Sequence, residues 1–330
     1  MIQSIQVYKE TIQEHEQTLI EDALSSQPLP EKEKLITTLS DYVGAGKHVR
    51  GGLYLKGRSW WEDLSDKDYR IAACIELLHS AMLIQDDIMD DDEQRRNMPS
   101  LHVQFQSFHD EHRIHEGMAV CVADLLIFQA MTTLAETDAG TAVQAGDDIR
   151  EVTFAQFRDV THGDPWSEGV EPTVKDILNL HRNKTGRYTF GLPLSAALKR
   201  SGRSPTPNLL QLCEALGVIY QLRDDELNVF GQSKTTGKSS LSDVWDNKRT
   251  ILRHLVINEH PSVEPLFGTT LSEKDRETLL AAFEDVRSAH DDYKERFIGE
   301  AKSRIVDSDL PASAKKELKA LTEYIAERER

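Results

Sequence analysis

Glycine and proline are scarce in this sequence, which has 18 glycines and 11 prolines among 330 residues. Their combined share of about 9% lies below the roughly 12% that is usual in globular proteins. Both residues interrupt regular elements, so their scarcity favours long helices joined by short connections. Apolar residues recur at helical spacing, and no alternating run bounded by hairpin turns predicts a strand pair. The sequence therefore predicts an all-α fold, a single large helical domain over residues 1–330.

Basic residues and cysteines are also few. The 39 Lys and Arg residues are outnumbered by 56 Asp and Glu, which gives a net charge of −17. Nucleic-acid affinity comes mostly from clustered Lys and Arg, so a nucleic-acid partner is excluded. Cys74, Cys121 and Cys213 lie far apart in apolar helical patterns, which predicts reduced core thiols rather than a disulfide framework or a metal site.

Long apolar runs are missing as well. The most apolar stretches, 72–84 and 118–131, contain ionisable residues and are shorter than the roughly 20 residues of a membrane span. Residues 1–10 have no charged start followed by an apolar core, so they do not resemble a signal peptide. We therefore expect no membrane span and a cytoplasmic protein.

Helix starts, in contrast, are well marked. A Ser or Thr followed three residues later by an acid, at the head of an apolar periodic segment, is typical of a capping box. This pattern predicts helix starts at three places, Ser65 with Asp68, Thr173 with Asp176 and Ser272 with Asp275.

The first acidic turn, residues 86–90, ends an apolar helix that begins near Asp66. Asp86 and Asp90 are four residues apart and share a helix face, whereas Asp87 points about 100° away. Two carboxylates about 4 Å apart repel by roughly 4 kcal/mol at an effective dielectric of 20. Such a pair needs a cation, and hard divalent ions such as Mg²⁺ prefer oxygen ligands. The alternative is a solvated acidic helix end.

The second acidic turn, residues 224–228, repeats this design. Asp224 and Asp225 follow an apolar helix, and Asn228 offers an amide oxygen one helical turn later. If the two helices face each other, their oxygens suit several Mg²⁺ ions and a diphosphate.

Basic residues occur where a diphosphate would need them. Lys47 and Arg50 are three apart among glycines, and Arg95 and Arg96 follow the first acidic turn. His79, seven residues before Asp86, shares its helix face. Each cation alone is more typical of an ordinary surface residue, and His79 alone of a core histidine, but together they favour phosphate binding.

In this order, the motifs resemble the trans-isoprenyl diphosphate synthases, the family of farnesyl and geranylgeranyl diphosphate synthases. The resemblance covers residues 44–250. It rests on seven segments, which are Gly46–Arg50, Glu76–Asp90, Arg95–Arg96, Lys184–Thr185, Gln221–Asp225, Thr236–Lys238 and Lys248–Thr250.

The resemblance implies a homodimeric helical bundle with a central active-site cavity, and a role for each matched residue. The diphosphate of isopentenyl diphosphate would be held by Lys47, Arg50, His79 and Arg96. The diphosphate of the allylic partner would be bound by Arg95, Lys184, Lys238 and Lys248. Three magnesium ions would be carried by Asp86, Asp90 and Asp224, and positive charge near the reacting carbon would be stabilised by Thr185 and Gln221.

The implied reaction joins the two substrates head to tail. The allylic diphosphate departs, the isopentenyl double bond attacks the allylic cation, and a proton is lost to the released pyrophosphate. Water must be excluded, because it would quench the cation.

Three positions depart from the family pattern. Asn228 stands where the family commonly has Asp, Gly51 where Pro is frequent, and Gln85 where His is frequent. An amide oxygen still ligates magnesium or orients a bound water, so we expect weaker metal affinity rather than inactivity.

Product length depends on the helix below the first acidic turn. Short-chain members of the family often have an aromatic residue at the position of Ala81, five before Asp86. A small residue there favours a product longer than fifteen carbons, so we expect geranylgeranyl diphosphate, with farnesyl or longer polyprenyl products as alternatives. Met82, Ile127 and Phe128 are the candidate floors of the cavity.

Two other functions compete with chain elongation. A terpene cyclase of the same fold also ionises allylic diphosphates but needs no isopentenyl site, which Lys47, Arg50 and Arg96 argue against. A non-catalytic regulatory subunit typically lacks the first acidic turn, which is intact here.

Overall fold

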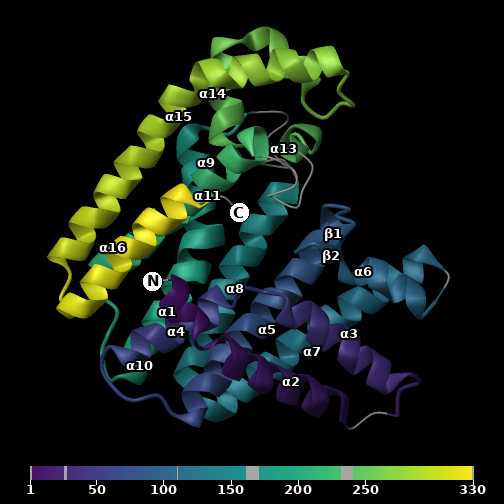
Figure 1. Cartoon of the computed structure of the whole chain (residues 1–330), viewed down its shortest axis with the longest axis vertical. Coiled ribbons are helices and arrows are strands. Elements are labelled where there is room, and N and C mark those ends of the chain that lie inside the picture. Colours follow the sequence, from purple (N-terminus) through teal and green to yellow (C-terminus); the bar gives the residue numbers. More distant parts are fainter. Residues whose placement is uncertain (1, 26–27, 110, 161–170, 232–240, 329–330) are drawn as a thin grey trace. The chain divides into compact units, whose positions relative to one another are not determined.

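The computed structural model describes residues 2–25, 28–109, 111–160, 171–231 and 241–328 (Figure 1). Helices form almost all of this part of the chain, so the predicted all-α class is confirmed. By internal contacts the chain divides into two compact units. Unit 1 comprises Met1–Asp147 and Leu192–Pro205, and unit 2 comprises Asp148–Gly191 and Thr206–Arg330. The single domain over 1–330 stays a prediction.

Unit 1 is built from helices and one hairpin. Its elements are α1 (Ile2–Gln6), α2 (Lys9–Ser25), α3 (Lys32–Gly44), α4 (Val49–Ser59), α5 (Asp66–Met89), β1 (Gln94–Arg95), β2 (Met98–Pro99), α6 (Leu101–Gln104), η1 (Phe105–Ser107), α7 (His112–Thr137), the first part of α8 (Ala139–Val160) and α10 (Leu192–Arg200).

Unit 2 takes the rest of α8 and is helical throughout its described residues. Its further elements are α9 (Val174–His181), η2 (Arg182–Gly191), α11 (Pro207–Phe230), α13 (Ser242–Trp245), α14 (Ile251–Glu259), η3 (Pro261–Leu266), α15 (Glu273–Asp307) and α16 (Ala312–Glu327).

Helix starts follow the capping chemistry in the sequence. Ser65, Thr173 and Ser272 each form a reciprocal capping box with the acid three residues later, at the heads of α5, α9 and α15. The three predicted starts are confirmed. The start of α11 uses Thr206, whose hydroxyl accepts a hydrogen bond from the Leu209 backbone N–H, with Pro207 at the first helical position.

The core of unit 1 is the contact of α5 with α7, which lie side by side (Figure 1). Residues 71–78 of α5 are buried almost all round, so this helix lies inside the unit rather than on its surface. The start of α4 crosses α5 closely, because a Cβ on Gly51 would lie 2.8 Å from the Ala72 carbonyl oxygen. A larger residue at position 51 would push α4 away.

Helix α7 is longer than its apolar stretch suggested. Its 26 residues are long and apolar enough to cross a membrane by length and composition, so the expectation that this stretch is too short for a membrane span is wrong. One such helix is weak evidence, and its inner face, with Ala119, Ala123 and Leu126, is buried as in a core helix. Cys121 is exposed on the other face, so the prediction of a core thiol is wrong there, while Cys74 and Cys213 are buried.

The antiparallel hairpin of β1 and β2 directly follows the first acidic turn and was not predicted. Gln94 pairs with Pro99 and Arg95 with Met98. The two turn residues, Arg96 and Asn97, have φ values of 56° and 63°. Both therefore adopt the left-handed conformation of a two-residue hairpin turn, whose twist matches that of the strands. Only Asn97 is a typical residue for this conformation, which explains why the turn could not be predicted from the residue types.

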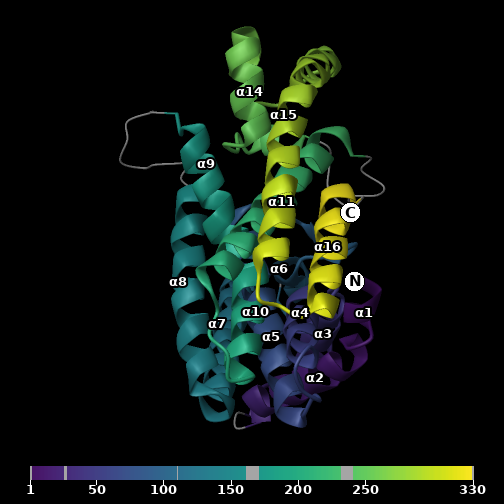
Figure 2. The same ribbon diagram turned by 90° about the vertical axis from the view of Figure 1, so that its left-hand side faces the viewer.

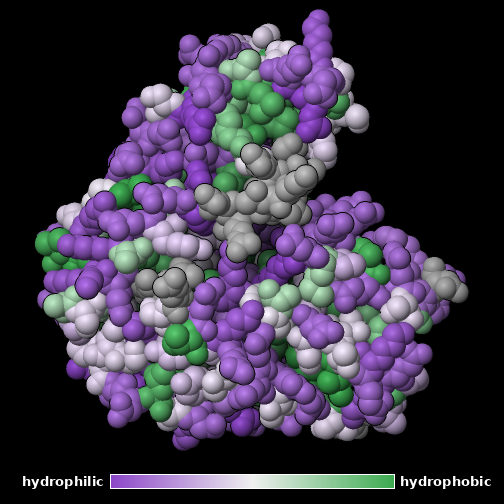
Figure 3. All heavy atoms as spheres, in the orientation of Figure 1, coloured by the Kyte–Doolittle hydropathy of each residue, from purple (hydrophilic) through white to green (hydrophobic). Residues whose placement is uncertain are grey.

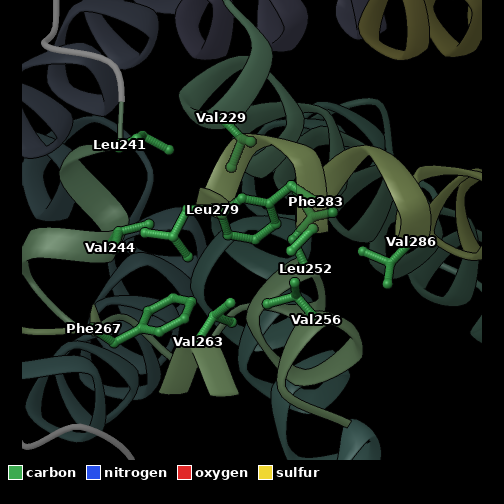
Figure 4. Packing of buried hydrophobic residues seen from close by; sticks show 11 residues of the cluster. Val229, Leu241, Val244, Leu252, Val256, Val263, Phe267, Leu279, Phe283 and Val286 are labelled. Carbon is green, nitrogen blue, oxygen red and sulfur yellow. The ribbon is translucent and has the colours of Figure 1, made fainter. Parts of the chain in front are cut away.

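Unit 2 is organised around α11, with α15 and α16 beside it (Figure 2). Below the end of α11, an apolar cluster joins α11, α13, α14 and α15 (Figure 4). Phe283 of α15 is fully buried there, together with Leu241 and Leu252. This cluster holds the segment after residue 240 against the end of α11. The visible surface of the described residues is mostly hydrophilic, in keeping with the net charge of −17 (Figure 3).

Candidate active site

In the first acidic turn, the three aspartates have different surroundings. Helix α5 continues through Asp86 and Asp87, and Asp90 caps it, with its N–H donating to the Asp86 carbonyl oxygen at 2.9 Å. Asp86 and Asp90 are partly exposed, whereas Asp87 is fully buried. His79 and Met82 are partly exposed too, so these four residues mark the open face of the helix.

Asp87 is a structural carboxylate. Its Oδ2 accepts a hydrogen bond from the Tyr42 hydroxyl at 2.9 Å, and its Oδ1 accepts one from Arg95 Nε at 2.5 Å. Burial raises the pKa of Asp87, although Arg95 and Tyr42 oppose the shift by stabilising the charged form. The middle acid of the motif therefore anchors the helix end to α3 and to the hairpin.

Arg95 is held by the acidic turn itself. Beyond Asp87, its guanidinium lies 3.5 Å from Asp86 Oδ2 and 3.0 Å from Asp92 Oδ2. These carboxylates, above all Asp87, keep the pKa of Arg95 above its ordinary value against the effect of burial. The hairpin thus supplies a fixed cation inside the first acidic turn.

A second group of cations in unit 1 is arranged for an anion. Burial, Arg50, Arg96 and Arg95 hold the pKa of His79 well below its usual range, which means that the arginines lie close to a neutral imidazole. Arg96 Nη1 is buried and has no hydrogen-bond partner among the described residues. A Cβ on Gly46 would lie 2.8 Å from this nitrogen, so glycine is what lets the guanidinium reach the 46–50 segment. Lys47 is exposed beside it.

In unit 2, a π-helical segment presents Lys184 and Thr185. Such segments in α-helical proteins often occur at functional sites. Segment η2 crosses α11 at two glycines, because a Cβ on Gly217 would lie 2.2 Å from the Gly186 backbone nitrogen. This contact brings Gln221 Nε2 within 2.8 Å of Thr185 Oγ1. The two residues predicted to stabilise positive charge are therefore adjacent.

The second acidic turn carries more unbalanced negative charge than the first. The side chain of Asp224 is 57% exposed and its Oδ1 lies 2.6 Å from Arg328 Nη2. Asp225 is buried, and its Oδ2 has no hydrogen-bond partner among the described residues. Burial, together with the charges of Asp243, Asp224 and Asp159, raises the pKa of Asp225 well above its ordinary value.

Asp159 is a site residue that the sequence reasoning missed. Its carboxylate forms an ion pair with Lys184, and although burial alone would raise its pKa, Lys184 and Lys248 hold that pKa below its ordinary value. Asp159 lies in a sequence with no second acid beside it, so no motif marked it. Its helical phase could not reveal a partner 25 residues away.

Asn228 holds the segment that contains Lys248. Its Nδ2 donates to Ser242 Oγ at 2.6 Å, and its Oδ1 accepts from the Asp243 backbone N–H at 3.2 Å. Asp243 in turn accepts, through its carbonyl oxygen, a hydrogen bond from the Lys248 N–H at 2.8 Å. The amide that replaces the family's Asp thus has both of its polar atoms engaged with α13.

These donors fit a hard divalent cation. The partly exposed Asp86 and Asp90 share one face, and the repulsion around Asp225 is what a nearby cation would relieve. No group of three His, Cys, Asp or Glu side chains is already assembled in the part of the chain that the structure describes. Lys238, predicted to bind the allylic diphosphate, lies outside the described residues.

Two of the residues considered for product length face elsewhere. Ala81 is fully buried and lies about 140° around α5 from Asp86, so it is not on the open face. Phe128 is 68% exposed, so it is not packed as a cavity floor would be. The exposure of Phe128 contradicts its role as a cavity floor, whereas the role of Ala81 beside the product tail stays a prediction. Met82 and Ile127 are partly exposed.

Comparison with known proteins identifies the family of this chain. The polyprenyl synthetase family profile matches residues 32–286. A short chain isoprenyl diphosphate synthase of Methanocaldococcus jannaschii is 27% identical over 211 residues, 63% of this chain and 61% of that protein, so the chain spans about three fifths of that relative. A geranylgeranyl diphosphate synthase of Saccharolobus solfataricus is 25% identical over 87% of this chain and 86% of that protein.

Solved structures share the fold. A geranylgeranyl pyrophosphate synthase of Corynebacterium glutamicum, complexed with isoprenyl diphosphate and magnesium, superposes with a TM-score of 0.85 at 21% identity, covering 98% of this chain and 99% of that one. Other relatives, each 29% identical, are a geranylfarnesyl and a farnesyl diphosphate synthase. The chain belongs to the polyprenyl synthetase family and is by class a prenyltransferase, an isoprenyl diphosphate synthase.

Proposed function

We propose that the protein condenses isopentenyl diphosphate with an allylic diphosphate, head to tail, and that geranylgeranyl diphosphate is the main product. The observation that supports condensation best is the cationic group of unit 1, where a buried N–H of Arg96, beside Arg50 and neutral His79, has no partner in the described part of the chain. A buried guanidinium with a free donor suits an anion that brings its own acceptors. A terpene cyclase has no use for this second anion site.

The residues of unit 1 bind and orient the nucleophile. Lys47, Arg50, His79 and Arg96 hold the diphosphate of isopentenyl diphosphate, with neutral His79 acting as a hydrogen-bond partner rather than a fourth charge. Arg95, fixed by Asp87, contributes positive charge toward the allylic diphosphate from within the first acidic turn.

The residues of unit 2 act on the allylic substrate. Lys184 and Lys248, together with Lys238, bind its diphosphate and offset the charge that develops as it departs. The hydrogen-bonded pair of Thr185 and Gln221 presents oxygen atoms toward the electron-poor carbon, which stabilises the allylic cation. The proton lost from the isopentenyl unit goes to the released pyrophosphate.

Asp86, Asp90 and Asp224 are the residues that would hold magnesium, three ions by family resemblance. When bound, these ions neutralise the diphosphate and make it a better leaving group. The partial exposure of Asp86 and Asp90 and the unbalanced charge around Asp225 support this assignment.

The product length follows from Met82 rather than Ala81. Met82 lies on the open face of α5, one turn below Asp86, and its flexible side chain leaves more room for a product tail than an aromatic ring would. We expect Met82→Phe to shift the main product from twenty carbons to fifteen or fewer. Met89→Phe, the same change on the same helix beyond Asp86, is the control and leaves the distribution unchanged.

The deciding assay uses the purified chain with magnesium, labelled isopentenyl diphosphate and each allylic starter in turn, with chromatography of the products. Chain elongation without any partner protein supports the proposal and excludes the regulatory subunit. Cyclic hydrocarbons from an allylic diphosphate alone would instead identify a terpene cyclase. An unchanged product from Met82→Phe would remove the basis for the twenty-carbon assignment while leaving condensation intact.

A homodimer in the cytoplasm is the proposed assembly and location. Val120 and Phe128, eight residues apart on α7, are 41% and 68% exposed, which supports a partner that covers these apolar side chains. Phe128→Glu is expected to shift the sedimentation profile from dimer to monomer. A wild-type chain that sediments as a monomer at micromolar concentration would overturn the dimer.

A further inference from the structure

His48 occupies a buried position between two residues of the proposed isopentenyl diphosphate site, Lys47 and Arg50. Its backbone has φ 50° and ψ 42°, the left-handed conformation, at the N-cap of α4. Its side chain is 1% exposed. An imidazole in a conformation that favours glycine or asparagine, and this deeply buried, must be held by its contacts.

Both ring nitrogens of His48 face oxygen acceptors. Nδ1 lies 2.9 Å from the Gly46 carbonyl oxygen, and Nε2 lies 2.8 Å from Glu16 Oε2. A carbonyl oxygen only accepts, so Nδ1 carries a hydrogen. The Nε2···Oε2 contact then needs one more proton, which sits either on the imidazole or on the carboxyl. Without it, a ring lone pair would face a carboxylate.

The pair lies among charges of both signs. The titratable and charged groups around it are Glu76 and His79 of α5, Arg96 of the hairpin and Arg50 of α4, which acts on both His79 and Arg96. The requirement for a proton therefore comes from the contact itself and not from the sum of these charges. Loss of the proton would leave Glu16, which is 2% exposed, without a donor at Oε2, and its Oε1 already lacks a partner among the described residues.

The pKa directions agree with this picture. Burial alone would lower the pKa of His48, but the hydrogen bond and charge of Glu16, with the charge of Glu76, raise it above its ordinary value. Burial raises the pKa of Glu16 as well, against the effect of His48. Both shifts favour retention of a proton by the pair.

We propose that Glu16 and His48 share one proton and that this proton positions residues 46–50, so that binding of isopentenyl diphosphate weakens at alkaline pH. The inference rests on the proposed function of Lys47 and Arg50, which it deepens. His48 and Glu16 are positioning residues, since neither carries the charge offered to the substrate. The direction follows from linkage. A group whose pKa is raised in the folded state stabilises that state fully at low pH, and this stabilisation is lost as the pH rises through the raised pKa.

Glu16→Gln removes the shared proton while it keeps the position of the His48 ring. The glutamine amide donates an N–H to the unprotonated Nε2, while Nδ1–H still donates to Gly46, so the ring stays in place without a shared proton. His15→Ala is the matched control, because His15 on the same helix pairs with Asp66, whose side chain is 85% exposed. Arg50→Ala tests the substrate site separately.

The kinetic measurement compares how the KM for isopentenyl diphosphate and kcat each change with pH. We expect the wild-type KM to rise about fivefold or more between about pH 7 and about pH 9.5, with kcat changing less. The KM of Glu16→Gln should change by less than about twofold over the same range, because no proton is lost. His15→Ala should follow the wild type. Substrate ionisation is the same for all variants, so the comparison isolates the protein group.

The second readout needs no substrate. Nitrogen-15 NMR of the His48 ring should show a protonated, proton-sharing imidazole at neutral pH in the wild type and a neutral Nδ1–H tautomer in Glu16→Gln. Identical ring spectra, or parallel KM profiles for the two proteins, would overturn the proposal. If Arg50→Ala leaves the KM unchanged, the assignment of the isopentenyl site has failed instead, whatever the ring spectra show.

Discussion

The two acidic turns begin with the same two residues, Asp-Asp, but differ in how their charge is balanced. In the first, the second aspartate, Asp87, is buried with Arg95 and Tyr42 against it. In the second, the equivalent Asp225 is buried, one of its oxygens has no partner within the ranges that the structure describes, and Asp243 and Asp159 contribute further negative charge. The first turn carries its own cation, whereas the second depends more on cations from elsewhere.

This difference indicates that a repeated motif does not imply repeated roles. A buried carboxylate that is paired fixes geometry, while one that is unpaired raises the local demand for positive charge. We therefore expect the aspartates of the first turn to divide cleanly, with Asp86 and Asp90 serving chemistry and Asp87 serving stability. The second turn should show no such division, since Asp224 also pairs with the largely buried Arg328.

The largest effect is expected from Asp86→Ala. Loss of a metal ligand should lower turnover by about a thousandfold or more, while the fold stays intact because one of two repelling carboxylates has gone. Steady-state turnover with saturating magnesium and thermal unfolding without metal check the two parts. Asp224→Ala should lose turnover equally but also some stability, because Arg328 loses its partner. Turnover within about tenfold of wild type in either variant would show that the assignment of Asp86 and Asp224 as magnesium ligands is wrong.

An intermediate effect, on stability rather than on turnover, is expected from Asp87→Ala. Removing this carboxylate leaves the Tyr42 hydroxyl and the Arg95 guanidinium without their buried partner, at a cost of about 3 kcal/mol in the free energy of unfolding. Urea denaturation gives this value directly. The matched variant Asp86→Ala should change it by less than about 0.5 kcal/mol. Equal stability losses in the two variants would remove the distinction between the aspartates.

The smallest effect concerns Asn228. If the amide is a metal ligand, Asn228→Asp should increase the apparent magnesium affinity, since a carboxylate replaces a neutral group. If it mainly holds α13, the carboxylate still accepts from the Asp243 backbone N–H, the Ser242 hydroxyl becomes the donor in place of the acceptor, and the affinity changes by less than about twofold. Asn228→Ala should then raise the KM for the allylic diphosphate through Lys248. Magnesium titration of pyrophosphate binding by calorimetry distinguishes the two roles.

Much of the fold followed from local chemistry. Capping boxes fix where α5, α9 and α15 begin, because each is satisfied within four residues. The hairpin after the first acidic turn did not follow, since Arg96 at positive φ is stabilised by its packing and not by its own preference. The phase of α5 placed Asp86, Asp90 and His79 on one face, but the burial of Ala81 depended on neighbours from other helices.

The site could be predicted only where residues are close in sequence or match a motif. The pairing of Asp159 with Lys184 and of Glu16 with His48 joins residues 25 and 32 positions apart on different elements. No spacing rule connects such pairs, because their distance is set by how helices cross. The Gly217 contact with Gly186 is of the same kind, and it lies where η2 crosses α11 and Thr185 meets Gln221.

The hairpin that carries Arg95 and Arg96 directs these two neighbouring side chains to different places. Neighbouring residues at the start of the turn point to different surroundings, so Arg95 reaches the aspartates and Arg96 reaches the loop at Gly46. Under the proposed function, these two adjacent residues would therefore supply cations to two separate substrates. Inserting a single residue between Met89 and Gln94 would move Arg95 into the place of Arg96 and leave Gln94 facing the aspartates, so the length of this short connection matters to the site as much as the charges do.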